Sequence, residues 1–395
     1  MAAVAGVIAE YNPFHLGHAY QLSAIREMLG EDTAIVAVMS GNFVQRGECA
    51  IMEKHARAEA AVLGGADLVL ELPTVYSAAT AEIFARGGVE ALAATGVVTH
   101  LCFGSESGEI EPLRAAADCL ASEDYRAALR RFLEGGMSFA SARQAAAESL
   151  IGEAAQCLSG ANNNLGVEYL RAMKRIGTSM EPITVRRIGD GHDSEAAGEY
   201  PSASAIRRAI LGGDAWQHMV PEGTAAVLER EMEMGRAPSA MTCAGRSILY
   251  RLRCMQEEDF LPYDGGEEGL YHRFYKAVRQ GNNLEEILNL AKTKRYTHAR
   301  LRRMALHAWL GLERAPERMP YLRVLAANKR GCGLLKEMKV CAALPVITKS
   351  AGVRKMGEEA DRFFAAEARN TDLYALCCPA IGGVDSDYTT DPVIL

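Results

Sequence analysis

The stretch “VAGVIAEYNPFHLGH”, residues 4–18, decides how the fold of this chain is interpreted. It opens with an uninterrupted apolar run at residues 4–9, and such a run is typical of a strand that is covered on both faces. Pro13 lies in the exit from this run, because proline cannot continue a sheet and often opens a turn. A helix is expected to begin near His15. The stretch therefore predicts the first strand and the first helix of an α/β domain.

Four more apolar runs continue this pattern along the first half of the chain. They lie at residues 34–40, 66–73, 98–104 and 182–188, and helix-like stretches occupy 16–29, 54–64, 79–94 and 112–135, with an Ala- and Ser-rich helical insertion at 136–170. Strands that alternate with helices predict an α/β fold with a doubly wound parallel sheet of five strands. In a strand order of 3-2-1-4-5, the first and fourth strands end side by side, where ligands bind in such sheets.

The second half of the chain has a different pattern, mostly of amphipathic helices. These are expected at residues 224–234, 244–257, 269–281, 284–291 and 298–312. We therefore expect an α/β domain at 1–225 and a mainly helical C-terminal domain at 226–395. A late strand is also expected at 340–348, and the tail after Ile381 is expected to be a loose extension.

Composition excludes several classes of protein. The 395 residues contain no apolar run of about 18, so no membrane span or membrane partner is expected. No signal peptide is recognisable, which predicts a cytoplasmic protein. The ten cysteines form no CxxC pair, so neither a metal site nor a disulfide framework is indicated. A net charge of -7 argues against indiscriminate coating of nucleic acid, but a local basic patch remains compatible with it.

The first candidate site is the start of the first helix, where His15 and His18 flank Gly17. Backbone N–H groups at a helix start are unpaired and attract anions, and the glycine leaves room for a phosphate. The two histidines are three residues apart and share a face, from which they could donate hydrogen bonds to phosphate oxygens. Gly104 follows the fourth strand as a nucleotide-binding loop would require. The alternative is a capped turn with one histidine in the core and one at the surface.

The second candidate site is the helix start “YPSASAIRRAILGG” at residues 200–213. Ser202 is suited to cap the helix, Ser204 lies in its first turn, and Arg207 follows one turn later. Hydroxyls, free amides and a guanidinium suit a polyphosphate. The alternative is an ordinary capped helix with a solvated arginine. Asn162 precedes an expected helix near residue 165, where it would cap that helix or read a nucleobase, and Arg187 ends the fifth strand.

Several motifs occur in an order that resembles the bacterial tRNA(Met) cytidine acetate ligase family. They are “EYNPFHLGH”, “MSGNFVQRGE”, “ADLVLELP”, “FGSESG”, “NNNLGVEYL”, “SASAIR” and “KTKRYTHARLRRM”, whereas the end of the chain matches nothing that we can place. The HxGH pattern is shared with the wider nucleotidylyltransferase superfamily. The resemblance implies a nucleotidylyltransferase or Rossmann-like fold. It also implies that ATP activates acetate to acetyl-adenylate, and that the acetyl group passes to the wobble cytidine of elongator tRNA(Met), giving N4-acetylcytidine.

The resemblance also implies roles for individual residues. His15, His18 and Arg207 would be catalytic. The ATP site would comprise Gly104, Asn162, Arg187, Ser202, Ser204 and the whole stretch of Val7, Ile8, Ala9, Glu10, Tyr11, Asn12, Pro13, Phe14, His15, Leu16, Gly17, His18, Ala19 and Tyr20. Ser204 stands where the family often has threonine, and Asn164 where relatives tend to have an apolar residue. Mg²⁺ is expected to accompany ATP, although the sequence shows no dedicated carboxylate cage.

Two stretches are candidates for contact with tRNA. Asn42, Gln45 and Arg46 follow the second strand and could receive the cytidine or the anticodon loop, unless they form a solvated loop. A basic run supplies Lys292, Lys294, Arg295, Arg300, Arg302 and Arg303, and Tyr296 within it could stack on a base. The alternative for the basic run is a solvated helix face. The sequence indicates no obligate protein partner.

Two other functions are compatible with these patterns. One is a nucleotidylyltransferase that makes a coenzyme from a small-molecule precursor and has no RNA substrate. The other is an RNA-binding protein with a vestigial nucleotide site, against which the intact HLGH and SASAIR motifs argue.

Overall fold

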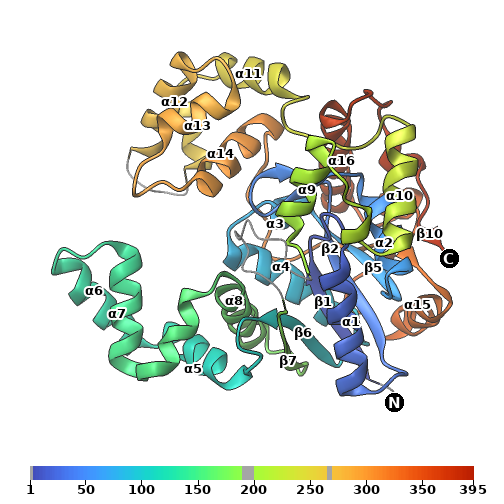
Figure 1. The fold of residues 1–395 in the computed structure, drawn as a ribbon, viewed down its shortest axis with the longest axis horizontal. Helices are drawn as coiled ribbons and strands as arrows, with labels where there is room; N and C mark the ends of the chain where they lie inside the picture. Colours follow the sequence, from blue (N-terminus) through green and yellow to red (C-terminus); the bar gives the residue numbers. More distant parts are fainter. Residues whose placement is uncertain (1–2, 189–199, 265–268) are drawn as a thin grey trace.

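A twisted sheet with helices on both faces forms the centre of the computed structural model, which describes residues 3–188, 200–264 and 269–395 (Figure 1). Within these residues the sheet has eight strands, and its main path runs β10-β8-β5-β2-β1-β6-β7. The five predicted strands form the consecutive segment β5-β2-β1-β6-β7, which confirms the expected order 3-2-1-4-5. They are β1 (Val4–Ala9), β2 (Ala34–Ser40), β5 (Leu68–Leu72), β6 (His100–Ser105) and β7 (Glu181–Arg186).

The parallel register follows from the apolar runs. β1 pairs with β2 from Val4 opposite Ala34 to Ala9 opposite Met39. Successive side chains of a strand point to opposite faces, so each run supplies both layers of the core. One face is covered by α1 (Leu16–Leu29), α2 (Lys54–Leu63), α9 (Ala203–Gly212) and α10 (Glu222–Glu233). The other face is covered by α4 (Ala81–Ala94), α5 (Ile110–Ala121), α8 (Ala161–Ile176) and α15 (Lys329–Cys341).

The insertion after β6 differs in detail from the expectation. The helix expected at 112–135 divides at Ser122, whose side chain accepts a hydrogen bond from the Tyr125 amide at 3.1 Å and so caps a second helix. The segment contains α5, α6 (Glu123–Glu134), α7 (Phe139–Ile151) and the 3₁₀ helix η1 (Gly152–Ser159). α8 begins at Ala161 rather than near residue 165, which places Asn162 inside its first turn.

The helical lobe of the second half lies beside the sheet (Figure 1). It contains α11 (Gly245–Cys254), η3 (Glu258–Tyr263), α12 (Leu270–Gln280), α13 (Leu284–Ala291) and α14 (His298–Leu310). These elements share an apolar core that also contains Phe43 and Tyr374. The short hairpin of β3 (Phe43–Val44) and β4 (Glu48–Cys49) therefore packs between the sheet and the lobe.

The C-terminal third departs most from the expectation. β8 (Leu322–Ala327) pairs antiparallel with β5, while β9 (Val346–Ile347) and β10 (Val393–Ile394) pair parallel with β8. Of the strand expected at 340–348, only the two residues of β9 are a strand, and α15 continues to Cys341. The remaining elements are α3 (Thr74–Ser77), η2 (Gln217–Met219), η4 (Ser350–Lys355), α16 (Glu358–Tyr374), η5 (Ala375–Cys377) and α17 (Ser386–Thr389). A boundary at 225/226 thus leaves three strands of the central sheet in the second part.

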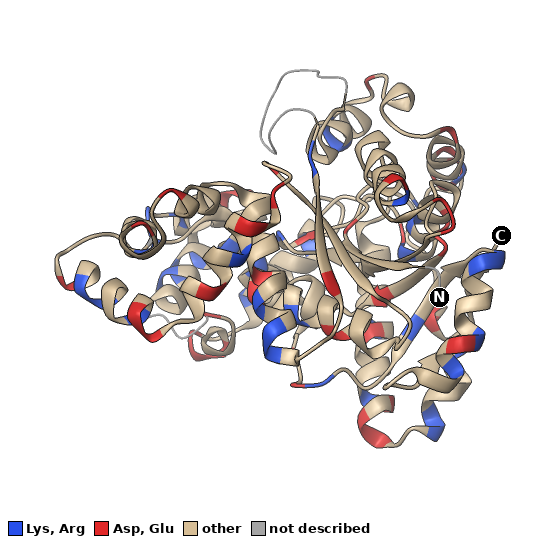
Figure 2. Ribbon diagram, turned by 90° about the horizontal axis from the view of Figure 1, so that it is seen from below, with Lys and Arg blue, Asp and Glu red and all other residues tan. Residues whose placement is uncertain are grey.

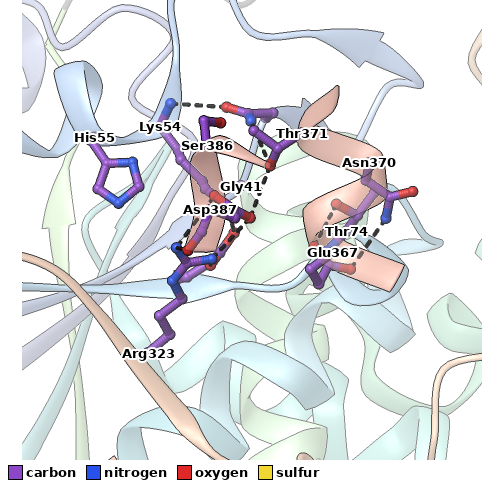
Figure 3. Close-up of polar contacts among 12 residues, drawn as sticks. Gly41, Lys54, His55, Thr74, Arg323, Glu367, Asn370, Thr371, Ser386 and Asp387 are labelled. Carbon is purple, nitrogen blue, oxygen red and sulfur yellow. Dashed lines mark hydrogen bonds and ion pairs between the residues drawn. The ribbon is translucent and has the colours of Figure 1, made fainter. Parts of the chain in front are cut away.

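The prediction of a loose C-terminal tail is wrong. Asp387 is 2% exposed, and its carboxylate lies 2.7 Å from the Lys54 amine and 2.9 Å from the Arg323 guanidinium. Figure 3 shows the side chains of Lys54, Arg323 and Asp387 converging. Glu71 of β5 completes the cluster at 2.8 Å from Lys54. Buried charges require such partners, so the tail is fixed to the sheet. No helix in the described ranges is long and apolar enough to cross a membrane.

Candidate active site

The two histidines of the HLGH motif are held by hydrogen bonds at the start of α1. His15 caps the helix: its Nδ1 accepts the Gly17 N–H at 3.0 Å, and Nδ1 of His18 accepts the His15 N–H at 3.2 Å. The ring centroids are 3.8 Å apart. A neutral imidazole carries one hydrogen, so both rings must carry it on Nε2. The capping expected in the alternative interpretation is real, but both rings line an open cleft.

Burial keeps these imidazoles neutral. It lowers the pKa of His15 to about 3, with further contributions from the charges of Arg187 and Arg207. The pKa of His18 is lowered well below its usual value by burial, by His15 and by Arg187. At neutral pH the pair therefore presents two uncharged N–H donors, which suits the stabilisation of negative charge on phosphate oxygens.

The cleft lies at the carboxyl ends of β1 and β6, as the strand order predicts. It holds about 1190 Å³ of open space and continues into a smaller cavity that shares His15, His18, Gly104, Arg187 and Ser202. Of the predicted site residues, the lining of the two cavities contains Ile8, Ala9, Glu10, Tyr11, Asn12, His15, Gly17, His18, Tyr20, Gly104, Asn162, Arg187, Ser202, Arg207, Gln45 and Arg46. Val7, Pro13, Phe14, Leu16, Ala19 and Ser204 are not among its walls. Val7 and Phe14 lie in the core instead.

Gly104 and Arg187 are positioned by adjacent strands. The Gly104 position faces Val185 across β6 and β7, and the Arg187 N–H donates to the Ser105 carbonyl at 2.9 Å. A Cβ atom at Gly104 would lie 3.1 Å from Cγ of Arg187. The glycine is therefore what allows the arginine side chain to lie across the end of β6.

Asn162 is held by Glu106, a residue that the sequence analysis missed. The Glu106 carboxylate accepts hydrogen bonds from the Asn162 N–H at 3.0 Å, from its side-chain amide at 3.0 Å and from the Asn163 N–H at 2.8 Å. Glu106 thus caps α8 from the loop after β6, where a negative charge favours the helix start. The sequence held one signal for this contact: a glutamate two residues after Gly104, which could cap the helix that begins at the “NNN” stretch.

Arg207 reaches back to the exit of β1. It donates to the Asn12 carbonyl at 2.9 Å and to the Ser204 hydroxyl at 3.3 Å, and lies 3.9 Å from Glu48. Ser202 caps α9 by accepting the Ala205 N–H at 3.2 Å. The two sequence-distant motifs, HLGH and SASAIR, therefore meet in one cleft.

The hairpin of β3 and β4 forms one wall of the cleft. Gln45, Arg46 and Glu48 line it, but the predicted tRNA contact at Asn42 does not fit. Asn42 is 2% exposed, its side-chain Oδ1 accepts the backbone N–H of Lys54 at 2.9 Å, and its side-chain amide donates to the Thr371 hydroxyl at 3.2 Å. Its side chain is therefore committed to internal contacts. Glu48, which the sequence analysis did not single out, pairs with Arg302 at 2.8 Å.

Known proteins match this chain over nearly its whole length. The chain matches the family model described as HIGH Nucleotidyl Transferase over residues 1–386. The tRNA(Met) cytidine acetate ligase of Caldanaerobacter subterraneus subsp. tengcongensis is 40% identical over 382 residues, covering 94% of this chain and 94% of that protein. A protein of the same name from Thermoanaerobacter sp. is 37% identical over 398 residues, covering 97% and 98%. The chain belongs to the tRNA(Met) cytidine acetate ligase family.

Solved structures of an acetate ligase of this family have the same fold. Thermotoga maritima TmcAL without ligand gives a TM-score of 0.93 at 34% identity, covering 100% of this chain and 99% of that chain. The same protein bound with α-thio ATP gives a TM-score of 0.91 over the same coverage. These matches include the C-terminal tail, which the sequence analysis could not place.

The basic run of this family member divides into two groups. Arg302 and Arg303 of α14 face the hairpin: Arg303 donates to the Gln45 carbonyl at 3.4 Å. Lys292, Lys294 and Arg295, by contrast, are exposed on the link between α13 and α14. Figure 2 shows basic and acidic residue positions interspersed along the ribbons of the helices, so any RNA-binding surface is local.

Two residues of this run differ from the expectation in detail. Tyr296 is 7% exposed, and the guanidinium groups of Arg295 and Arg300 lie 5.8 and 5.6 Å from its ring centroid. Its predicted role in stacking on a base is therefore wrong. Arg300 also donates to the Asp264 carbonyl at 2.6 Å. In the part of the chain that the structure describes, no group of three metal-ligating side chains occurs.

Proposed function

We propose that this chain is an ATP-dependent ligase that activates acetate as acetyl-adenylate and acetylates the wobble cytidine of elongator tRNA(Met). The observation that carries this proposal is the pair of neutral histidines facing Arg207 in one cleft, in a chain related over its full length to proteins of that name. The same relatives do not favour a coenzyme nucleotidylyltransferase without an RNA substrate.

The first step needs no protein nucleophile. An acetate oxygen attacks the α-phosphorus of ATP, and the bond to the leaving diphosphate breaks. The Nε2–H groups of His15 and His18 donate to the phosphate oxygens as charge shifts toward the leaving group. Arg207, with Ser202 and Ser204 at the start of α9, holds the diphosphate. Rate enhancement then comes from positioning and from charge stabilisation.

The nucleoside is held on the other side of the histidines. Gly104 lets Arg187 lie beside the cleft, and Glu106 orients Asn162 at the start of α8. We assign the adenosine to Gly104, Arg187 and Asn162, because the first two lie at the carboxyl ends of β6 and β7, where such sheets bind nucleotides, and Asn162 lines the same cleft. A Mg²⁺ ion would be held mainly by phosphate oxygens and water, as is usual for this ion.

The tRNA approaches over the hairpin. Gln45 and Arg46 line the cleft, and Arg302 and Arg303 fasten the hairpin to α14. Lys292, Lys294 and Arg295 lie exposed next to that helix and supply phosphate contacts. We therefore assign the helical lobe, together with the hairpin, to the binding of the anticodon arm.

Two measurements test the proposal. The first is acetate-dependent exchange of labelled diphosphate into ATP, and the second is the mass of tRNA(Met) after incubation with ATP and acetate. We expect exchange without tRNA, and a mass increase of one acetyl group on the tRNA. Exchange that requires a phosphorylated coenzyme precursor instead of acetate would overturn the proposal.

A further inference from the structure

The second half of the reaction requires a proton acceptor that the histidines do not provide. When the exocyclic amine of cytosine attacks the acetyl carbon, a C–N bond forms, and the amine must lose a proton as AMP leaves with the electrons of the broken C–O bond. The Nδ1 atoms of His15 and His18 are both occupied by backbone N–H groups. Their Nε2 atoms already carry hydrogen, so neither ring has a free lone pair in the cleft.

Two carboxylates line the cleft among the described residues, and they differ in their partners. Both oxygens of Glu48 face cations, with Arg302 at 2.8 Å and Arg207 at 3.9 Å. Glu10 has one oxygen bonded to the Gln45 N–H at 2.9 Å, and in the described part of the chain no cation lies within ion-pair distance of it. Among the described residues, Glu10 is therefore the carboxylate of the cleft that forms no ion pair.

The position of Glu10 is fixed by the fold. It follows β1 directly, and its carbonyl accepts a hydrogen bond from Arg57 at 2.6 Å. Arg57 is fully buried and also donates to the Ser40 carbonyl at 3.0 Å. The side chain of Glu10 reaches the hairpin through Gln45. Glu10 therefore lies between the phosphate-binding histidines and the wall that faces the tRNA.

The surroundings of Glu10 suit a base acting on an aromatic amine. Phe84, Phe103, Leu165 and Tyr169 form an apolar wall of the same cleft. The Glu10 charge is close enough to Tyr169 to add to the effect of burial in raising the pKa of that phenol. A wall of this kind can hold a flat pyrimidine and excludes water from a reactive anhydride.

We propose that Glu10 is the catalytic base of acetyl transfer and accepts the proton that the cytosine N4 amine loses. This inference rests on the proposed function and extends it to the second step. The free carboxylate oxygen takes the proton as the C–N bond forms, and water later removes it. Such proton transfers contribute roughly 10²- to 10⁴-fold to a rate.

The test separates the two half-reactions in Glu10→Gln, which keeps the acceptor oxygen for Gln45. We expect single-turnover acetylation of tRNA to fall at least about 100-fold more than acetate-dependent diphosphate exchange does. Acetyl-adenylate should accumulate on the variant, and the dependence of transfer on the ionisation of a carboxyl group should disappear from the pH profile. Glu27→Gln, at an exposed position of α1, is the matched control.

Several results would overturn the assignment. Transfer at the normal rate in Glu10→Gln would exclude a base at this position. Exchange and transfer falling by the same factor would make Glu10 a residue that positions ATP. Glu10→Asp keeps a carboxylate, so it should transfer at least about tenfold faster than Glu10→Gln, and equal rates would contradict the proposal. Absence of exchange in the unmodified enzyme would instead contradict the proposed function.

Discussion

At the scale of single residues, hydrogen bonds fix the tautomers of the two histidines, so both rings carry their hydrogen on Nε2. His18 donates from Nε2 into the cleft while its Nδ1 holds the His15 amide. His18→Ala removes the donor that we propose for the reacting phosphates, so diphosphate exchange should fall about 10²- to 10³-fold. Affinity for tRNA, measured by filter binding, should stay within about twofold. His218→Ala, in the exposed element η2, is the control, and a large loss of tRNA binding in His18→Ala would contradict this role.

The same burial predicts a pH dependence of stability. The pKa of His15 is about 3 in the folded chain, against an ordinary value near 6.5. The unfolded chain thus takes up a proton below pH 6.5 that the folded chain refuses until about pH 3. Stability is fully present above pH 6.5 and is lost as pH falls, by up to about 1.4 kcal/mol per pH unit. Urea unfolding at pH 7.5 and 5.0 should show a smaller difference in His15→Gln, and an equal difference would contradict the burial of a neutral ring.

At the scale of elements, the hairpin of β3 and β4 couples the cleft to the helical lobe through Gly47. Its φ is +79°, and a Cβ atom there would lie 2.5 Å from the backbone nitrogen of Arg303. Gly47→Ala should therefore move the hairpin away from α14 and slow tRNA acetylation more than diphosphate exchange. Gly136 has a similar φ of +85°, but a Cβ atom there would meet no other atom within 4 Å. Gly136→Ala therefore measures only the destabilisation caused by the left-handed backbone, about 1–2 kcal/mol. Equal losses of stability in both variants would show that the contact with α14 does not matter.

The exposed link between α13 and α14 gives a prediction on tRNA binding. Lys292→Ala combined with Lys294→Ala removes two exposed charges, so affinity for tRNA should fall and its dependence on salt should become shallower. Diphosphate exchange should be unchanged. The comparison is Lys336→Ala with Lys339→Ala, which removes two exposed charges from α15. An equal loss in that comparison would remove the link from the tRNA site.

Elements with a local signal were predictable from the sequence, and those that depend on distant partners were not. β1, β2 and α1 were predicted at their observed bounds, because continuous apolar runs and a histidine cap are local features. β8 was missed because Arg323 interrupts its apolar run. That arginine is buried only because Glu71 lies 3.3 Å away and Asp387 lies 2.9 Å away. The same distinction holds in the candidate site. HLGH and SASAIR are local motifs, whereas Glu106 and Glu48 act through contacts with residues far away in the sequence.

At the scale of the whole molecule, the C-terminal tail closes the structure through buried charges. Lys54 and Arg323 share the carboxylates of Glu71 and Asp387, and Thr371 of α16 also donates to Asp387 at 3.0 Å (Figure 3). Burial favours a neutral Lys54, and Arg323 adds to this, but the nearby carboxylates hold the pKa of its amine above the usual value. The cluster therefore remains ionised, and its ion pairs fix the C-terminal tail to the central sheet.

Removing one member of this cluster should lower the free energy of unfolding more than removing a residue that makes only surface contacts. Asp387→Ala leaves two buried cations with Glu71 as the nearest carboxylate, and loss of one partner in such a pair typically costs about 3–5 kcal/mol. Asp391→Ala, at an exposed position of the same tail, should change the free energy of unfolding by less than about 0.5 kcal/mol. Because the Thr371 hydroxyl donates to Asp387 and accepts from the side-chain amide of Asn42, the loss should also loosen the loop before the hairpin. The free energy of unfolding of both variants is measured by urea unfolding. Similar small losses in the two would show that β10 alone holds the tail.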